Sequence, residues 1–278
     1  MPSFASAAGT PLHYRLRGEG PLLVCHPGGP GRPASYLDTL GGVDRVRTLL
    51  LLDPRGVGRS APAESYAFPA LAQDLEALRM HLGVERLDLL AHSAGTFPVL
   101  TYAAAHPDRI GRLVLLTPPS LIAGPVDDAE QAALAERYYG HQPWFPAAIH
   151  AFRAYHPSLS EQQKNALLAQ SAPLFYGVWN ETARQHATRP HDSTAAPAAR
   201  NGFWVPGFDP TGLAKVTSPV TIIAGDRDVF TSPTAPAVIA GWFPDATVTW
   251  LTGCGHSPWI DRPDDTAVAI QRALDRRP

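Results

Sequence analysis

Cysteine is scarce in this chain of 278 residues, which contains only Cys25 and Cys254. Two cysteines so far apart cannot form the network of disulfides that stabilises small secreted domains, and neither lies in a sequence with metal-ligand spacing. We therefore expect reduced thiols and a cytoplasmic protein.

Charged residues are also few. They make up 17% of the chain, the formal net charge is −2, and lysine occurs only at Lys164 and Lys215. Proteins that bind nucleic acid or an anionic membrane through electrostatic attraction present clustered basic side chains. This sequence has no basic run, so we expect neither kind of partner.

Long apolar runs are missing as well. No stretch approaches the roughly 20 residues that span a bilayer, and residues 1–10 lack the charged start and apolar centre of a secretory signal. Hydrophobic residues nevertheless make up 45% of the sequence. Composition and length together predict a globular protein with one well-buried α/β domain, or one domain that carries a large insertion.

Short apolar runs alternate with helical patterns in the first part of the chain and again near its end. Residues 48–52 are apolar without interruption, as in parallel strands buried on both faces, whereas residues 12–17 alternate as in an edge strand. Leucines spaced four, three and four apart predict an amphipathic helix over 68–82. The predicted strands are 12–17, 21–25, 48–52, 86–90, 112–117, 220–224 and 247–251, and the helices are 68–82, 96–106, 236–242 and 264–276.

This alternation stops at Pro119. From there to about Lys215 no buried-strand run occurs, and the pattern predicts helices near 129–139, 147–155, 160–170 and 174–186. The segment holds 12 of the 24 aromatic residues, which indicates a surface that covers something. We predict an α/β fold with a mostly parallel sheet, built from residues 1–118 and 216–278, and a helical insertion at 119–215.

Ser93 lies in Ala91-His-Ser-Ala-Gly95, where an apolar run ends and a helix is predicted to begin. A strand, a sharp turn with small flanking residues and a helix whose N-terminus points at the serine together form a nucleophile elbow. The first small position is Ala91, where glycine is more usual. We predict that Ser93 is a nucleophile.

A serine hydroxyl needs a base to remove its proton and an acid to orient that base. In this architecture the acid and then the histidine follow the serine, each in a loop after a later strand. Gly225-Asp-Arg-Asp228 follows the predicted strand 220–224, and Gly253-Cys-Gly-His256 follows 247–251. His256 is therefore the predicted base and Asp228 the predicted acid, with Asp226 as its rival in the same loop.

The oxyanion that forms when a serine attacks a carbonyl needs backbone N–H donors. His26-Pro-Gly-Gly-Pro-Gly31 follows a buried run, and because proline has no N–H, Gly28 and Gly29 are the donors between the two prolines. We predict Gly29 together with Ala94, which follows the nucleophile, and keep Gly28 as the alternative. His92, next to the nucleophile, is interpreted as structural.

These motifs, together with Asp53-Pro-Arg-Gly-Val-Gly-Arg-Ser60, resemble those of the α/β-hydrolase superfamily, and within it the prolyl iminopeptidase-like serine hydrolases. The resemblance covers nearly the whole chain. It implies a helical cap inserted after the sixth strand, at residues 119–215, and a reaction that needs no metal or cofactor. The implied substrates are small molecules or short peptides, from which an N-terminal residue, often proline, is released.

The resemblance has departures. Those peptidases commonly carry Gly-Gly-Ser-Trp-Gly at the elbow, whereas Ala-His-Ser-Ala-Gly is widespread among esterases and other hydrolases. Their cap carboxylates hold the substrate's ammonium, and Glu181, imagined as a buried carboxylate beside aromatic rings, is the candidate here. The alternative is an ordinary surface glutamate. Trp179, Tyr138 and Trp144 are candidate pocket residues, with a core position as the alternative reading.

Three activities therefore stay open. The first is an aminopeptidase-like amidase, and the second is an esterase, lactonase or thioesterase for a small apolar acyl compound. The third is a ligand-binding protein on the same scaffold without hydrolysis. Epoxide hydrolase and dehalogenase chemistry is disfavoured because those enzymes carry aspartate where this chain has Ser93. The oligomeric state cannot be inferred from the sequence.

Overall fold

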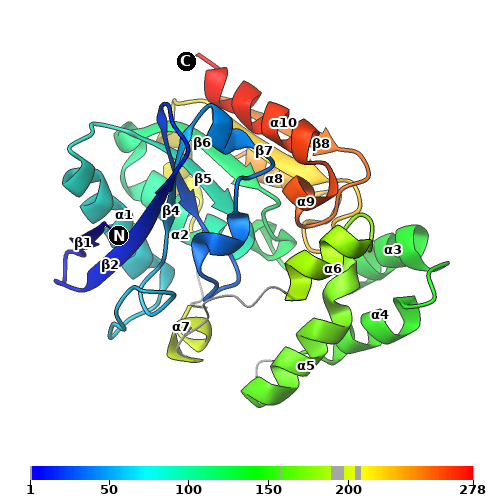
Figure 1. Cartoon of the computed structure of the whole chain (residues 1–278). Coiled ribbons are helices and arrows are strands. Elements are labelled where there is room, and N and C mark those ends of the chain that lie inside the picture. The colour runs from blue at the N-terminus through cyan, green and yellow to red at the C-terminus, as the bar shows by residue number, and fades with distance from the viewer. Residues whose placement is uncertain (1, 157, 189–196, 204–207, 278) are drawn as a thin grey trace.

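The computed structural model describes residues 2–156, 158–188, 197–203 and 208–277. In them, eight strands form one sheet in the order β1-β2-β4-β3-β5-β6-β7-β8 (Figure 1). β2 pairs antiparallel with both β1 and β4, and all other neighbours pair parallel. The strands are β1 (Ser3–Ala5), β2 (Pro11–Arg17), β3 (Leu22–His26), β4 (Thr48–Leu52), β5 (Leu87–His92), β6 (Ile110–Leu116), β7 (Val220–Gly225) and β8 (Ala246–Leu251).

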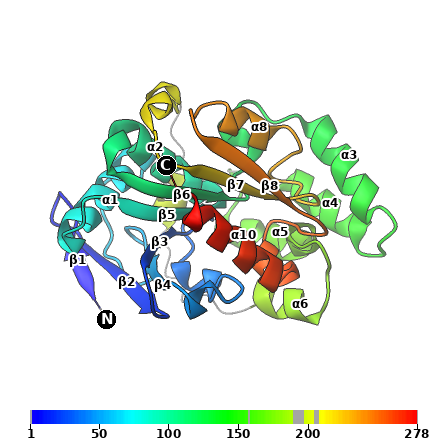
Figure 2. The same ribbon diagram turned by 90° about the horizontal axis from the view of Figure 1, so that it is seen from above.

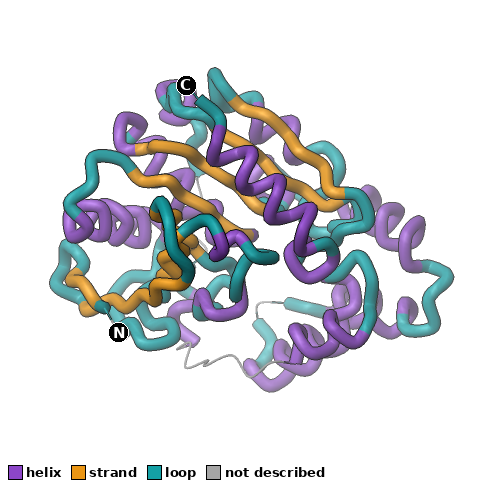
Figure 3. The backbone as a smooth tube through the Cα atoms, turned by 45° about the horizontal axis from the view of Figure 1, so that its top comes forward, coloured by secondary structure: helices purple, strands orange, loops and turns teal. Residues whose placement is uncertain are grey.

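Hydrophobic clusters cover both faces of this sheet. Successive side chains of a strand point to opposite faces, so Leu89 of β5 joins one cluster and Leu90 joins the other. Helices α1 (Phe68–Leu82), α2 (Thr96–Ala105) and α8 (Ala235–Ala240) pack on the first face, and α9 (Pro258–Asp261) and α10 (Pro263–Asp275) on the second (Figures 2 and 3). The predicted parallel α/β sheet is confirmed.

The edge of the sheet differs from the prediction. Residues 12–17 fall within β2, but β1 pairs with β2 and forms the edge in its place. β1 has only three residues, which is too short for an alternating pattern to be recognised. By contrast, α1 has the same bounds that its leucine spacing predicts.

Between β6 and β7 the described residues form helices and no strand. These helices are α3 (Asp128–Tyr139), α4 (Phe145–Ala154), α5 (Glu161–Ser171), α6 (Glu181–Thr188) and α7 (Pro197–Asn201). Figure 1 shows α3 to α6 gathered beside the sheet, whereas α7 lies apart from them. Ala199 of α7 packs instead with Val57 and Tyr66 from the loop that follows β4.

The prediction of one helix over 174–186 is wrong. A 3₁₀ turn at Ala172–Phe175 ends at the start of that range, and α6 begins only at Glu181. Between them the chain lies against the loop after β8, so close that a Cβ on Gly177 would collide with the carbonyl oxygen of Gly253. The side-chain oxygen of Asn180 then accepts the amide of Ala183 at 3.0 Å, as at the start of a helix.

A small apolar core joins these helices to the sheet. Tyr139, Phe145 and Leu174 pack around Val229, which comes from the loop after β7. The inserted helices therefore hold that loop from one side. No helix among the described residues is both long enough and apolar enough to cross a bilayer.

Candidate active site

Ser93 follows directly on β5 and opens the 3₁₀ turn Ser93–Gly95 that leads into α2. Its backbone has φ +52°, a left-handed conformation that serine rarely adopts. Space around the turn is minimal, since a Cβ on Gly28 would lie 2.8 Å from the Cβ of Ser93, and one on Gly95 would collide with the carbonyl oxygen of Pro27. This strained strand–turn–helix geometry is that of a nucleophile elbow.

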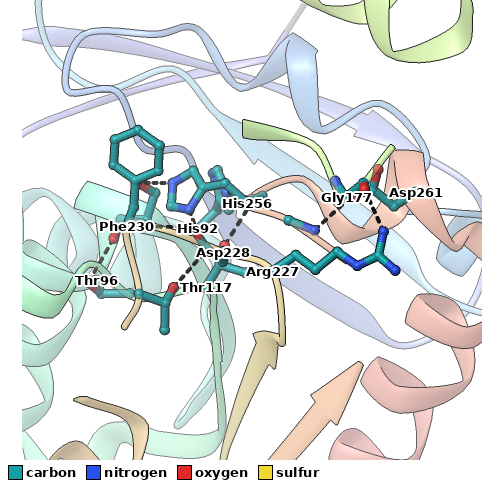
Figure 4. Close-up of polar contacts among 12 residues, drawn as sticks. His92, Thr96, Thr117, Gly177, Arg227, Asp228, Phe230, His256 and Asp261 are labelled. Atoms are coloured by element: carbon teal, nitrogen blue, oxygen red, sulfur yellow. Dashed lines mark hydrogen bonds and ion pairs between the residues drawn. The ribbon is translucent and has the colours of Figure 1, made fainter. Parts of the chain in front are cut away.

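His256 links Ser93 to a carboxylate. Its Nε2 lies 2.8 Å from Ser93 Oγ, and its Nδ1 lies 2.8 Å from Asp228 Oδ2. The three residues lie in loops after β8, β5 and β7, and the parallel arrangement brings those strand ends to one edge of the sheet. Hydroxyl, imidazole and carboxylate thus form one continuous hydrogen-bonded line. Figure 4 shows His256 and Asp228 side by side in it.

The two aspartates of the loop after β7 have different surroundings. Asp228 is 1% exposed, and its carboxylate also accepts the amide of Phe230 at 2.9 Å and the hydroxyl of Thr231 at 2.5 Å. Asp226 instead accepts the amide of Gly253 at 2.7 Å. Among the described residues, only Asp228 of the two bonds to the imidazole of His256.

The glycines after β3 lie against the nucleophile turn. The amide of Gly28 donates to Tyr36 Oη at 2.8 Å, so this donor already has an acceptor. Gly29 is exposed, and no hydrogen bond within the described residues involves its amide or that of Ala94. The position of Gly28 against the turn brings the loop close to Ala94, because a Cβ on Gly28 would lie 3.2 Å from the Ala94 nitrogen.

The backbone of His256 is held by three partners. Its carbonyl accepts His92 Nε2 at 2.9 Å and Thr117 Oγ1 at 3.1 Å, and its amide donates to the carbonyl of Phe175 at 2.9 Å (Figure 4). Thr117, at the end of β6, has φ +45°, which is unusual for a β-branched residue. No motif in the sequence indicates these contacts, since they join segments that are distant in the chain.

Asp261, at the end of α9, connects the inserted segment to the loop that carries His256 through hydrogen bonds. Its carboxylate accepts the amides of Gly255 at 2.8 Å, Gly177 at 2.9 Å and Val178 at 3.3 Å, and Arg227 donates to the Gly177 carbonyl at 3.0 Å (Figure 4). Burial raises the pKa of Asp261 to about 6, although the three amide donors act in the opposite direction. Asp261 lies in none of the motifs recognised in the sequence, so its contacts were not predicted.

Glu181 does not occupy the buried position imagined for it. Its side chain is 70% exposed and bonds to Arg184 and Gln185 on its own helix, which lower its pKa. The expectation of a buried carboxylate beside aromatic rings is therefore wrong. The reason is that α6 begins at this residue and buries its other side, with Ala183 and His186, so that Glu181 lies on the exposed side.

The three aromatic candidates lie among the inserted helices. Trp179 is half-buried against Tyr176, with ring centroids 5.4 Å apart, while Tyr138 and Trp144 pack on the small core around Tyr139. No ring contact joins any of these three to His256 within the described residues. The rings beside His256 are His92 and Phe230, each at 5.0 Å, and Phe175 at 6.0 Å. Phe175 and Phe230 stack on each other.

Titratable groups elsewhere do not gather into a metal-binding cluster: no group of three or more His, Cys, Asp or Glu in the described part of the chain could hold a metal ion.

Residues 21–263 match the sequence profile of a family described as alpha/beta hydrolase fold. A proline iminopeptidase from Lactobacillus helveticus is 24% identical, over 96% of this chain and 95% of that protein. A (lyso)-N-acylphosphatidylethanolamine lipase from Bos taurus is 30% identical, over 94% of this chain and 80% of the relative. An esterase from Rhodococcus sp. ECU1013 has a similar structure, with a TM-score of 0.76, 21% identity and coverage of 98% of both chains.

Proposed function

Because this chain belongs to the α/β-hydrolase fold family and is an enzyme of that family, we propose that it is a serine hydrolase that works through an acyl-enzyme. The observation that carries the proposal is the pair of 2.8 Å contacts that His256 makes with Ser93 and Asp228. Asp228 holds the imidazole so that Nδ1–H points at the carboxylate and Nε2 faces the hydroxyl.

In the first half of the reaction, His256 takes the proton of Ser93 while Oγ attacks the substrate carbonyl. The amides of Gly29 and Ala94 stabilise the oxyanion, and Gly28 is set aside because Tyr36 already accepts its N–H. His256 then gives its proton to the leaving group as the acyl bond breaks. In the second half, His256 takes a proton from a water molecule, which attacks the acyl carbon. His256 then gives that proton to Ser93 Oγ as the acyl–oxygen bond breaks, and the acid is released.

The surroundings of the site favour an apolar acyl group in an ester, thioester or lactone. Phe175 and Phe230 stack beside His256, and both are only partly buried, so they offer apolar surface to a substrate. Binding of a substrate ammonium would call for a carboxylate aimed at the site. Glu181 points to solvent, and Asp261 and Asp226 are occupied by backbone amides.

An aminopeptidase-like amidase is the second candidate. It is favoured by the similarity to a proline iminopeptidase, which extends over 96% of this chain. A panel of short-chain nitrophenyl esters and aminoacyl-naphthylamides separates the two candidates. We expect faster turnover of the esters, and a preference for prolyl amides would favour the peptidase.

We further propose that residues 119–215 act as a helical cap, and that the substrate enters between it and the loops of the sheet. Support comes from the Phe175 carbonyl, which accepts the amide of His256, and from the apolar packing of the inserted helices on Val229. The catalytic residues thereby gain a cover that excludes water.

The test of the central proposal is covalent labelling. Ser93 Oγ is expected to displace fluoride from a fluorophosphonate probe, and mass spectrometry should locate the adduct on the peptide that contains Ser93. Ser93→Ala should lose both labelling and ester hydrolysis while it unfolds at an unchanged temperature. An unlabelled wild-type enzyme, or a Ser93→Ala variant with full activity, would refute the assignment and favour a ligand-binding protein.

A further inference from the structure

His92 connects two loops of the site although it immediately precedes the nucleophile. Its side chain is 3% exposed. Nδ1 lies 2.6 Å from Tyr36 Oη, and Nε2 lies 2.9 Å from the carbonyl oxygen of His256. Tyr36 Oη in turn lies 2.8 Å from the amide nitrogen of Gly28. Four residues from separate segments of the chain are thus joined end to end.

The hydrogen bonds of this line can run in only one direction from donor to acceptor. A carbonyl oxygen only accepts, so His92 Nε2 carries the hydrogen that it donates to His256. Burial lowers the pKa of His92 well below its ordinary value, so the ring is neutral and its Nδ1 accepts. Burial raises the pKa of Tyr36 to about 12, which keeps its hydroxyl protonated as the donor to Nδ1. The remaining lone pair of that hydroxyl accepts the amide of Gly28.

The two ends of the line are functional elements of the proposed reaction. Gly28 begins the loop that carries Gly29, and it lies against the turn of Ser93, where a Cβ would collide with the His92 carbonyl and the Ser93 side chain. The other end is the backbone of His256, the proposed base. Movement of either loop away from Ser93 would break a buried hydrogen bond and leave a polar group unpaired.

We propose that Tyr36 and His92 are positioning residues, which hold the Gly28–Gly29 loop and the His256 backbone in register with Ser93. This inference rests on the proposed serine hydrolase activity. Neither side chain touches the reacting atoms, and they act through the loops that they join. Misplacement of a catalytic group by less than 1 Å is enough to slow turnover strongly.

The first experiment compares Tyr36→Phe with Tyr102→Phe. Both tyrosines are buried, and Tyr102 donates its hydroxyl to Glu76 Oε2 at 2.9 Å between α2 and α1, away from the site. The final extent of fluorophosphonate labelling gives the number of folded sites. Hydrolysis of a short-chain nitrophenyl ester then gives KM, and kcat per labelled site. We expect kcat of Tyr36→Phe to fall about tenfold, because the hydroxyl that bonds to both His92 and Gly28 is lost, with KM within twofold.

Tyr102→Phe should lose a similar amount of thermal stability and keep its kcat. If kcat per labelled site is the same in the two variants, the hydroxyl of Tyr36 serves only stability and the inference is overturned. If the wild-type enzyme itself is not labelled, the serine hydrolase proposal fails, which is a different result from the same experiment.

The second experiment asks whether the bond to His256 matters by itself. The side-chain amide of His92→Gln can still donate toward the His256 carbonyl, whereas His92→Phe has no donor. We expect His92→Phe to lose about a hundredfold in kcat, and His92→Gln to recover about tenfold of that loss. Equal kcat values in these two variants would overturn the role of His92. If His92→Phe does not fold, the comparison of Tyr36→Phe with Tyr102→Phe tests the proposal.

Discussion

Asp228, in a loop at the carboxyl edge of the sheet, and Glu181, in the helices inserted after β6, are held very differently. In the loops, Asp228 and the His256 backbone each have several buried partners. In the inserted helices, Glu181 is exposed and bonds only within its own helix among the described residues. The proposed chemistry therefore depends on a carboxylate fixed by several contacts, whereas in the described part of the chain the contacts of Glu181 stay within its own helix.

The largest expected effect comes from Asp228, the carboxylate that we propose orients the base. Asp228→Asn would present an amide to His256 Nδ1 and favour the wrong tautomer, so we expect kcat for ester hydrolysis to fall by about 10³ to 10⁴. Asp226→Asn is the matched control in the same loop, and it should lose less than tenfold. Equal losses in the two variants would contradict the assignment of Asp228.

The crowding of the nucleophile turn gives the next largest effect. In Gly28→Ala the added Cβ would lie 2.7 Å from the carbonyl oxygen of His92 and 2.8 Å from Ser93 Cβ. The loop must shift, and we expect kcat/KM to fall about a hundredfold. Gly241→Ala is the control, because its Cβ would lie 3.3 Å from the carbonyl oxygen of Val238, the nearest atom beyond its neighbours in the chain, and its φ is −63°. Full activity of Gly28→Ala would show that the loop tolerates movement.

Asp261 joins the two regions, and its pKa of about 6 predicts a pH effect on stability. The folded protein binds this proton more tightly than the unfolded chain, whose aspartate has a pKa near 3.8. The contribution to stability is therefore present at low pH and is lost as the pH rises through 6. Relative to Asp261→Asn, the free energy of unfolding of the wild type should fall by up to about 3 kcal/mol between pH 4 and 7.

Urea unfolding at several pH values measures this difference. Asp265→Asn, which removes an exposed carboxylate paired with Arg262, is the control and should show no such trend. A difference that rises with pH would mean that the amide donors to Asp261 outweigh its burial.

The smallest effect is expected at Glu181. Glu181→Gln should change kcat/KM by less than twofold for nitrophenyl esters and for aminoacyl-naphthylamides alike, because the exposed carboxylate only pairs with neighbours on its helix. A loss above tenfold that is confined to the amides would restore the ammonium-binding role and favour the peptidase.

Local patterns were sufficient for most of the sheet. Uninterrupted apolar runs indicated the parallel strands, and leucine spacing gave the bounds of α1, because burial imposes a period on each element. The short edge strand β1 and the break before α6 were not predicted from the sequence. A three-residue strand has no period, and the break depends on Gly177 packing against Gly253.

The order of Ser93, the aspartate loop and His256 along the chain already identified the candidate residues, because strand ends of a parallel sheet share one edge. The sequence favoured Asp228 over Asp226 without showing which of the two meets His256, and no motif pointed to a part for Tyr36, His92 or Asp261 in the site. Those answers depend on which donors meet which acceptors after distant segments are packed together. Such pairing is fixed by tertiary structure, since hydrogen bonds need distances below about 3.5 Å that no spacing along the chain encodes.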